Sequence, residues 1–263
     1  MNESNSPRLD RQDLGKIALV SLRAARMIME SGGRAQVIAK SAQTVACGLG
    51  AEFLGLRIGY ASLAISLGDD ANMITRMVVV GRHGVNHRLD QAVRRVVQRI
   101  TTERMTPGEV EVELDRIAQT TPKHPPLFVA AATGLACAGF GRLLGVDWLA
   151  FVPILLASTL GQHARHYLLG KQMNPCVAAA MVAFGCALIS SQGAKLAGSD
   201  TVNLAMIASC LLLVPGVPAT NAQTDIMDGH PTMGSARAVS VLMIMIFATA
   251  GIWLAGAILG VHP

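Results

Sequence analysis

The sequence lacks most of the features that mark an enzyme or a nucleic-acid-binding protein. It contains no glycine-rich nucleotide-binding motif, no nucleophile-elbow motif and no zinc-protease helix motif. None of its five cysteines belongs to a C-x-x-C pair, and four of them lie within apolar stretches. Such cysteines are typical of small buried side chains. We therefore expect no catalytic residues, no disulfides, no cofactor and no metal.

Charge is nearly absent from the second half of the chain. Residues 1–126 contain 17 of the 22 Lys and Arg and 13 of the 17 Asp and Glu, whereas residues 127–263 contain 5 and 4. This split predicts a soluble domain over 1–126 and a membrane domain over 127–263. The net charge of +5 is spread over helix faces. It therefore favours a basic face near anionic lipid headgroups over a nucleic-acid site.

The first 126 residues predict a small α+β domain. Helical periodicity runs from Arg11 to Glu30 and stops at Gly32-Gly33, because glycine enters the left-handed C-cap conformation at little cost. The remaining signals, in chain order, are a helix over 34–48, a β-hairpin formed by Leu56–Leu67 and Met73–Val80 around Gly68-Asp69-Asp70, a helix through Leu89 and Ile100, and a helix that ends before Pro122.

The start of that last helix has the strongest local signal in the domain. Thr106 supplies a hydroxyl N-cap, Pro107 occupies the first helical position, and Glu109 stands at the third. By contrast, His83 and His87 have helical spacing but glycine between them and no carboxylate nearby as a third ligand, so they do not predict a metal site.

Five apolar stretches follow, each near the ~20 residues that cross a bilayer as a helix. We place them at about 127–145, 147–165, 174–192, 203–224 and 237–260. We expect no signal sequence before the soluble domain, since the first long apolar run begins at Pro126. The cationic residues also favour a cytoplasmic N-terminus and an external C-terminus: Lys123, Arg165, Lys171 and Arg237 against Arg142 and Lys195.

Small residues recur four apart within these stretches. The pairs are Gly134/Ala138, Gly141/Gly145, Gly251/Ala255 and Gly256/Gly260. This spacing lets helix backbones approach closely where lipid removes the hydrophobic driving force. Small residues are common in any multi-helix bundle, so the pattern predicts packing and not a function.

The fourth stretch differs from the others because two prolines flank a glycine in its middle. Pro215, Gly216 and Pro218 interrupt the backbone hydrogen bonds, and irregular backbone at this depth tends to line a cavity. Asn221 and Asp225 continue one face of the following half-helix, whose N-terminal dipole suits a carboxylate. These five residues are the predicted substrate path. The alternative is a simple kink, with both polar side chains already in cytoplasmic water.

Two arginines in the apolar half are weaker candidates for the path. Arg142 stands near the outer end of the first stretch and Arg165 near the inner end of the second. Either side chain could instead extend to the headgroup layer. His163 and His166 are spaced three apart, which would suit proton coupling, but we expect them to lie at the membrane interface.

These residues together resemble the threonine/serine exporter (ThrE-like) family. The resemblance rests on Leu-Leu-Leu-Val-Pro-Gly-Val-Pro at 211–218 with Asn221, Asp225 and Gly229-His230, and on the looser stretches Glu30–Gly33 and Arg82–Asn86. It extends from about Ile17 to Leu259 and is closest to the split members of the family. The family's N-terminal domain has been likened to a hydrolase, but we find no nucleophile and base here.

The resemblance implies a subunit of a bacterial inner-membrane exporter of small amino acids or carboxylates, such as threonine, serine or succinate. It also implies a partner for this half, which is either a small, separately encoded membrane subunit or a second copy. An ion gradient is the expected energy source, because no nucleotide-binding motif is present. Two alternatives remain open: a membrane-anchored enzyme, and a scaffold or sensor that acts through the soluble domain.

Overall fold

The computed structural model describes residues 9–69, 72–122 and 124–261. Its helices and strands divide between two compact units. Unit 1 comprises Met1–Pro122 with Val217–Ala238, and unit 2 comprises Lys123–Gly216 with Val239–Pro263. Asp70 of the predicted hairpin turn and Lys123 of the charge comparison lie outside the described residues.

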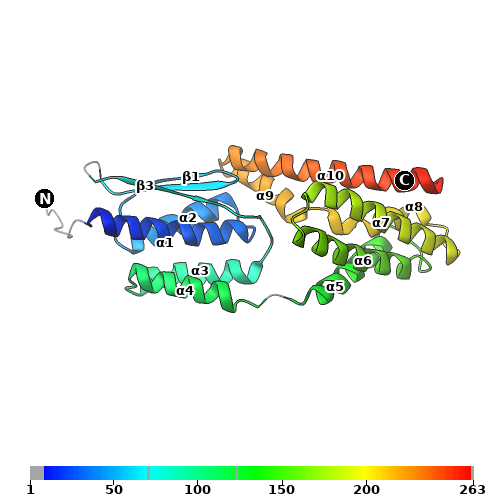
Figure 1. Cartoon of the computed structure of the whole chain (residues 1–263), viewed down its shortest axis with the longest axis horizontal. Helices are drawn as coiled ribbons and strands as arrows, with labels where there is room; N and C mark the ends of the chain where they lie inside the picture. Colours follow the sequence, from blue (N-terminus) through cyan, green and yellow to red (C-terminus); the bar gives the residue numbers. More distant parts are fainter. Residues whose placement is uncertain (1–8, 70–71, 123, 262–263) are drawn as a thin grey trace. The chain divides into compact units, whose positions relative to one another are not determined.

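Unit 1 is built in layers (Figure 1). Helices α1 and α2 pack on a three-stranded sheet, and helices α3 and α4 pack on α1 and α2 from the other side. The bounds are α1 Arg11–Glu30, α2 Ala35–Gly48, β1 Phe53–Ile58, β2 Ser62–Leu67, β3 Ile74–Val79, α3 His87–Thr102 and α4 Pro107–Thr120.

The core of unit 1 consists mainly of branched aliphatic side chains. The inward face of β2 contributes Leu63, Ile65 and Leu67, all fully buried. Each such side chain stabilises the fold by roughly 1.5–3 kcal/mol relative to exposure. Helix α1 is the middle layer, so it buries residues such as Ile17 and Leu22 around most of its circumference.

The sequence predictions for the helices of unit 1 are confirmed, whereas the hairpin was incomplete. Helix α1 ends as predicted, with Gly32 at φ +90°, and Thr106 forms the predicted capping box with Glu109. The predicted strand Leu56–Leu67 is two antiparallel strands in a β1-β2-β3 meander. Gly59 is the reason, because its N–H donates to the Ser62 carbonyl at 2.9 Å and closes a turn inside the run.

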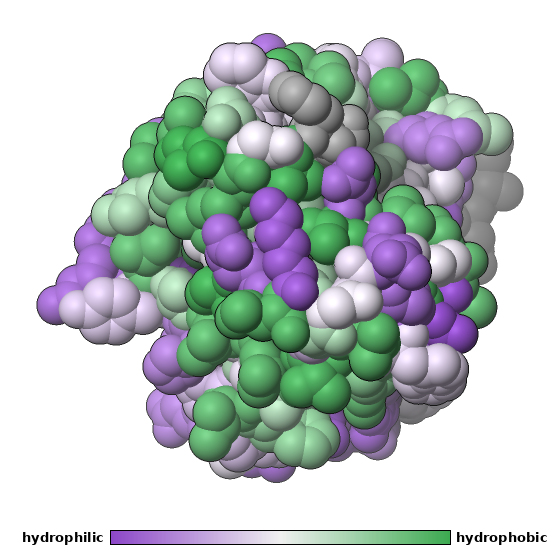
Figure 2. Space-filling model, turned by 90° about the vertical axis from the view of Figure 1, so that its right-hand side faces the viewer, coloured by the Kyte–Doolittle hydropathy of each residue, from purple (hydrophilic) through white to green (hydrophobic). Residues whose placement is uncertain are grey.

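Unit 2 is a bundle of apolar helices. Its elements are α5 Pro126–Leu143, α6 Phe151–Gly170, α7 Pro175–Leu196, α8 Val202–Ser209, the short 3₁₀ helix η1 Leu211–Leu213, and the later part of α10 Pro231–Leu259. Consecutive helices α5, α6, α7 and α8 are neighbours. Figure 2 shows that hydrophobic residues cover most of the face it presents, with hydrophilic residues gathered in smaller patches.

Among the described residues, three helices are long and apolar enough to cross a membrane: α5, α7 and α10. A fourth span results if the bent pair Val202–Leu213 and Gly216–Met227 is one crossing. The prediction of five spans is thus confirmed only in part, since α6 is not among the helices that are apolar enough to cross a membrane. Its length of 20 residues corresponds to about 30 Å of helix.

The boundaries of three predicted spans differ from the helices. Helix α6 begins at Phe151 rather than 147, because the Asp147 carboxylate accepts the Ala150 N–H at 2.9 Å and closes a turn first. Helix α10 begins at Pro231, and the expected polar connection over 225–235 shrinks to Asp228–His230. The fourth stretch is divided into α8, η1 and helix α9, Gly216–Met227.

The predicted small-residue contacts are real at two of the positions. A Cβ on Gly134 would overlap the Thr159 hydroxyl and the Leu155 carbonyl, and a Cβ on Gly251 would overlap the Ala180 carbonyl. Ala138 is fully buried as well. Glycine therefore sets the close approach of α5 to α6 and of α7 to α10.

Candidate functional site

The fourth apolar stretch loses its helical hydrogen bonds where the two prolines stand. Helix α8 ends at Ser209, η1 occupies Leu211–Leu213, and Val214 has an extended backbone at φ −67° and ψ 114°. The Gly216 N–H then turns back to the Val214 carbonyl at 2.9 Å, and α9 begins. The predicted break is therefore present, and it leaves carbonyl groups of η1 without helical partners.

Arg165 supplies one of the missing partners. Its Nη1 donates to the Leu212 carbonyl at 3.4 Å, from a half-buried position on α6. A guanidinium has five N–H donors, and this long contact uses one of them. Arg165 therefore places a cation beside the broken backbone of unit 2, with donors that remain available for a second acceptor.

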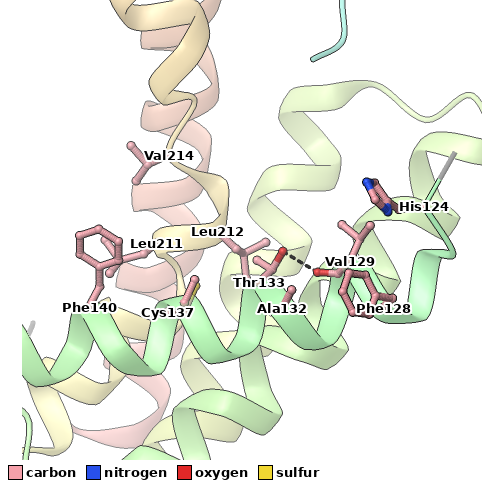
Figure 3. Close-up of a pocket in the computed structure, with 11 residues that line it drawn as sticks. His124, Phe128, Val129, Ala132, Thr133, Cys137, Phe140, Leu211, Leu212 and Val214 are labelled. Atoms are coloured by element: carbon pink, nitrogen blue, oxygen red, sulfur yellow. Dashed lines mark hydrogen bonds between the residues drawn. The ribbon is translucent and has the colours of Figure 1, made fainter. Parts of the chain in front are cut away.

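An apolar cavity of about 570 Å³ lies beside the same break, between α5 and η1 (Figure 3). It is lined on one side by α5 residues, including Phe128, Thr133 and Phe140, and on the other by Leu211, Leu212 and Val214. The Thr133 hydroxyl already donates a hydrogen bond to the Val129 carbonyl at 2.8 Å. With so few polar groups free to act, the cavity suits an apolar occupant and not a carboxylate.

The polar face that follows the break belongs to unit 1, where it binds the turn between α1 and α2. The Asp225 carboxylate is fully buried; its Oδ1 accepts the Ala35 N–H and its Oδ2 accepts Arg237 Nη1, both at 2.8 Å. Arg237 Nη2 donates to the Gly33 carbonyl at 2.7 Å. Asn221 Nδ2 donates to the Gly32 carbonyl at 2.8 Å.

The charges around Asp225 complement the positive end of helix α2. Helix α2 has no side-chain cap of its own, since Arg34 occupies the N-cap position. Asp225 instead receives the first N–H of α2 and places negative charge at the positive end of the helix dipole. Arg237, only 5% exposed, balances that charge. We call the group Asn221, Asp225, Arg237 and the Gly32 and Gly33 carbonyls the polar clasp.

A third stretch also binds the turn between α1 and α2, next to the polar clasp. In the loop before α3, the Gly84 N–H donates to the Glu30 carbonyl at 2.9 Å, and the Asn86 N–H donates to the Ser31 carbonyl at 3.1 Å. The Gly81 N–H donates to the Glu30 carboxylate at 2.7 Å. The two looser stretches of the resemblance, Glu30–Gly33 and Arg82–Asn86, thus lie together in unit 1 with Asn221 and Asp225, whereas most of its main stretch, 211–218, belongs to unit 2.

Arg142, the other weaker candidate, lies in the last turn of α5. Its guanidinium donates to the Val146 carbonyl and lies 4.4 Å from the centre of the Trp148 ring. Trp at such a position is typical of the membrane interface. Arg142 is already held, so it remains the weaker of the two arginines as a substrate ligand.

Within the part of the chain that the structure describes, no group of three His, Cys, Asp or Glu side chains is placed to hold a metal ion. His83 stacks on the Tyr60 ring with centroids 4.4 Å apart, and its Nε2 lies 2.8 Å from the Tyr60 carbonyl. The structure therefore gives this histidine a packing role.

Sequence reasoning missed the central member of the polar clasp. Arg237 entered the prediction only as a charge near the membrane, although it is one of just five Lys and Arg after residue 126. A cation in so apolar a region needs a buried partner, and that rule could have singled it out. Nothing in the spacing could have named Gly33 and Ala35 as its neighbours.

The apolar helices, the broken fourth stretch and the cation beside it together define a helical membrane protein of the transporter class. A family model described as a putative threonine/serine exporter (ThrE) matches residues 19–259. The chain therefore belongs to the threonine/serine exporter family, a family of membrane exporters of small molecules, and the resemblance found in the sequence is confirmed.

Two curated relatives extend over almost the whole chain. Both are named "Probable succinate transporter subunit YjjP". The protein from Klebsiella aerogenes is 26% identical over 255 residues, covering 96% of this chain and 98% of the relative. The protein from Escherichia coli strain K12 is 26% identical over 248 residues, covering 94% and 96%. No solved structure gives a significant match.

Proposed function

We propose that this chain is one subunit of an ion-gradient-driven exporter of small amino acids or carboxylates in the bacterial inner membrane. The observation that carries the proposal is the broken fourth stretch with the Arg165 guanidinium on the Leu212 carbonyl. A cation beside unwound backbone within an apolar bundle is the arrangement that recognises a carboxylate. Threonine, serine and a dicarboxylate such as succinate all present that group.

In the proposed path, Pro215, Gly216 and Pro218 form the break, and Asn221 and Asp225 stand at its cytoplasmic end. The Asp225 carboxylate is already engaged by Arg237 and Ala35. Its proposed role is therefore to hold α9 in place, while substrate contact falls to groups at the break.

We further propose five membrane crossings, with α6 as the second and the bent pair as the fourth. The soluble domain of about 126 residues would lie in the cytoplasm and the C-terminus outside. Cys47 is exposed on α2. A membrane-impermeant thiol reagent should label it in a Cys176→Ala background only after the cells are permeabilised; labelling in intact cells would contradict this orientation.

The partner is proposed to be a small, separately encoded membrane subunit of the same family, or a second copy of this chain. The relatives' names describe a transporter subunit, and the apolar cavity beside α5 offers a surface for another helix. Native mass spectrometry of the complex purified with its co-expressed partner would distinguish a hetero-complex from a homo-oligomer.

The function is tested by flux from proteoliposomes loaded with labelled threonine, serine or succinate, with and without the co-expressed partner. We expect an imposed ion gradient to accelerate the efflux of at least one substrate. Efflux of none of them under either condition would contradict the proposal and favour the enzyme or scaffold alternatives.

Arg165→Gln tests the substrate contact directly. Losing a charge-assisted hydrogen bond to a carboxylate costs roughly 1.5–3 kcal/mol, so transport should fall by about tenfold or more while the amount in the membrane stays constant. Lys195→Gln is the matched control. Lys195 lies exposed in the last turn of α7, and it donates one hydrogen bond to a backbone carbonyl, that of Leu259. Equal rates for the two variants would remove Arg165 from the path.

A further inference from the structure

The four arginines of α3 fall into two pairs with different surroundings. Arg94 binds the Asp90 carboxylate at 2.9 Å, and Arg99 binds Glu103 at 2.8 Å. Arg88 and Arg95 have no carboxylate within ion-pair distance among the described residues. They stand seven residues apart, so two helical turns bring them to the same face of α3.

That face borders a surface hollow of about 470 Å³ between α3 and α4 of unit 1. Arg116 of α4 lies at the same hollow and holds Glu113 through two hydrogen bonds, of 2.8 and 2.6 Å. The hollow thus carries three guanidinium groups against one carboxylate. Its other polar lining groups, the side chains of Gln91, Thr120 and Thr121, are uncharged.

In the part of the chain that the structure describes, the carboxylates of α3 and α4 that form ion pairs form them with arginines other than Arg88 and Arg95. Among the carboxylates on the two helices, Asp90 is held by Arg94 and Asp115 by Arg23 of α1. Arg88 also stands in the first turn of α3, where the helix dipole adds partial positive charge. The hollow is therefore an uncompensated cationic site, which favours an anion.

The position of the hollow along the chain indicates the source of that anion. Pro122 forms part of its lining, and α5, the first candidate membrane span, begins only four residues later at Pro126. Four extended residues reach at most about 14 Å. With α5 as a membrane span, as proposed above, this length of chain allows the hollow to reach the headgroup layer.

We propose that this hollow binds the phosphate of an anionic phospholipid headgroup, with Arg88 and Arg95 as its ligands. Guanidinium groups match the geometry of a phosphate through paired N–H donors, and they are preferred at such sites for that reason. The inference is independent of the transported substrate, since it concerns a different surface of the chain. It assigns α3 and α4 to the membrane surface.

The experiment measures binding of a fluorescent short-chain phosphatidylglycerol to the detergent-solubilised full chain. The test variant is Arg88→Gln/Arg95→Gln. The matched control is Arg57→Gln/Arg104→Gln, which removes the same charge from positions away from the hollow. Each arginine near an anionic surface is worth about fivefold in affinity, so the test variant should bind about 25-fold more weakly and the control within about twofold of wild type.

Two further arms separate the lipid from other occupants. Phosphatidylcholine with the same acyl chains should bind at least about tenfold more weakly than phosphatidylglycerol, and free glycerol 3-phosphate should compete only at much higher concentration. The proposal is overturned if the test variant keeps wild-type affinity. It is equally overturned if glycerol 3-phosphate binds as tightly as the lipid, because the occupant would then be a soluble phosphorylated molecule.

Thermal unfolding of both variants shows whether the chain is intact. Arg88 and Arg95 are exposed and make no ion pairs among the described residues, so the melting temperature should stay at that of wild type. A variant that binds weakly and also melts early is replaced by Arg88→Lys/Arg95→Lys. This pair keeps the charge but not the paired donors, so it should recover part of the phosphatidylglycerol affinity; an affinity no higher than that of the glutamine pair would count against a phosphate site.

Discussion

Unit 1 is held together by large aliphatic side chains and by charges that find partners, whereas unit 2 is held by small side chains and hydroxyl groups. In unit 1, Leu63 and Ile65 fill the core and a buried ion pair closes the polar clasp. In unit 2, the Ser158 hydroxyl donates to the Ser209 carbonyl at 2.9 Å, and Ser190 lies 2.9 Å from the Ser209 hydroxyl.

The difference is the one expected between a domain in water and a domain in lipid. In water, the burial of bulky apolar side chains stabilises the fold and exposed charges remain solvated, so a domain in water has a core of large residues. In lipid, burying an apolar side chain gives no hydrophobic stabilisation, so helices there associate through close backbone contact and hydrogen bonds. The composition of the two cores thus supports the proposal that unit 1 is a soluble domain and unit 2 a membrane domain.

The largest effect should come from breaking the polar clasp. Arg237→Met leaves the fully buried Asp225 carboxylate without its cation, and removing one partner of such a pair typically costs 3–5 kcal/mol. We expect the thermal unfolding of the full chain to shift accordingly, and transport to fall with it.

The charge-conserving variant Arg237→Lys is the matched comparison for the polar clasp. Lysine keeps the ion pair but cannot hold Asp225 and the Gly33 carbonyl together in the planar geometry of arginine. It should recover part of the stability. An unfolding temperature for Arg237→Met equal to that of wild type would show that the polar clasp does not hold unit 1 together.

A second, smaller effect tests the small-residue packing of unit 2. Gly134→Ala forces a methyl group against Thr159 and the Leu155 carbonyl, and overpacking of this kind costs typically 1–3 kcal/mol. Gly139→Ala on the same helix is the control, because nothing lies within 4 Å of its Cβ position. Alanine favours helix over glycine, so the control should be neutral or stabilising. The same loss for both variants would contradict close packing at Gly134.

The smallest effect concerns pH. Hydrogen bonds from the Ser199 hydroxyl and from the Ala150 and Asp200 N–H groups to the carboxylate in the α5–α6 connection lower the pKa of Asp147 to about 2. The ordinary aspartate pKa is about 3.9. The folded state therefore takes up this proton at a lower pH than the unfolded state does. The hydrogen bonds stabilise the fold above about pH 4, and this stabilisation is lost as the pH falls through about 2.

The measurement is the melting temperature between pH 5 and pH 2. Asp147→Asn should have a lower melting temperature at pH 5 and a shallower fall toward pH 2 than wild type. Parallel curves for the two proteins would show that this carboxylate contributes nothing to the pH dependence.

Most of the secondary structure follows from local signals in the sequence. Helix α1 ends at Gly32 because glycine takes the positive φ that the turn requires, and α4 begins at Thr106 because the capping box satisfies its first N–H groups. The break at Pro215 is equally local, since proline removes a backbone donor wherever it stands. Local rules failed at Gly59, where the glycine divided an apolar run that has the composition of one strand.

The sequence by itself determined the division into a charged half and an apolar half, the position of the broken stretch and the family. These depend on composition and on neighbouring residues, so no folding was needed to find them. Only the tertiary structure decided that Asp225 pairs with Arg237 and caps α2, 190 residues earlier. It also decided that Arg165 lies at the break, and that Arg88 and Arg95 line a hollow without an ion-pair partner among the described residues. Such contacts join distant residues, and their energies appear only when packing removes water from between them.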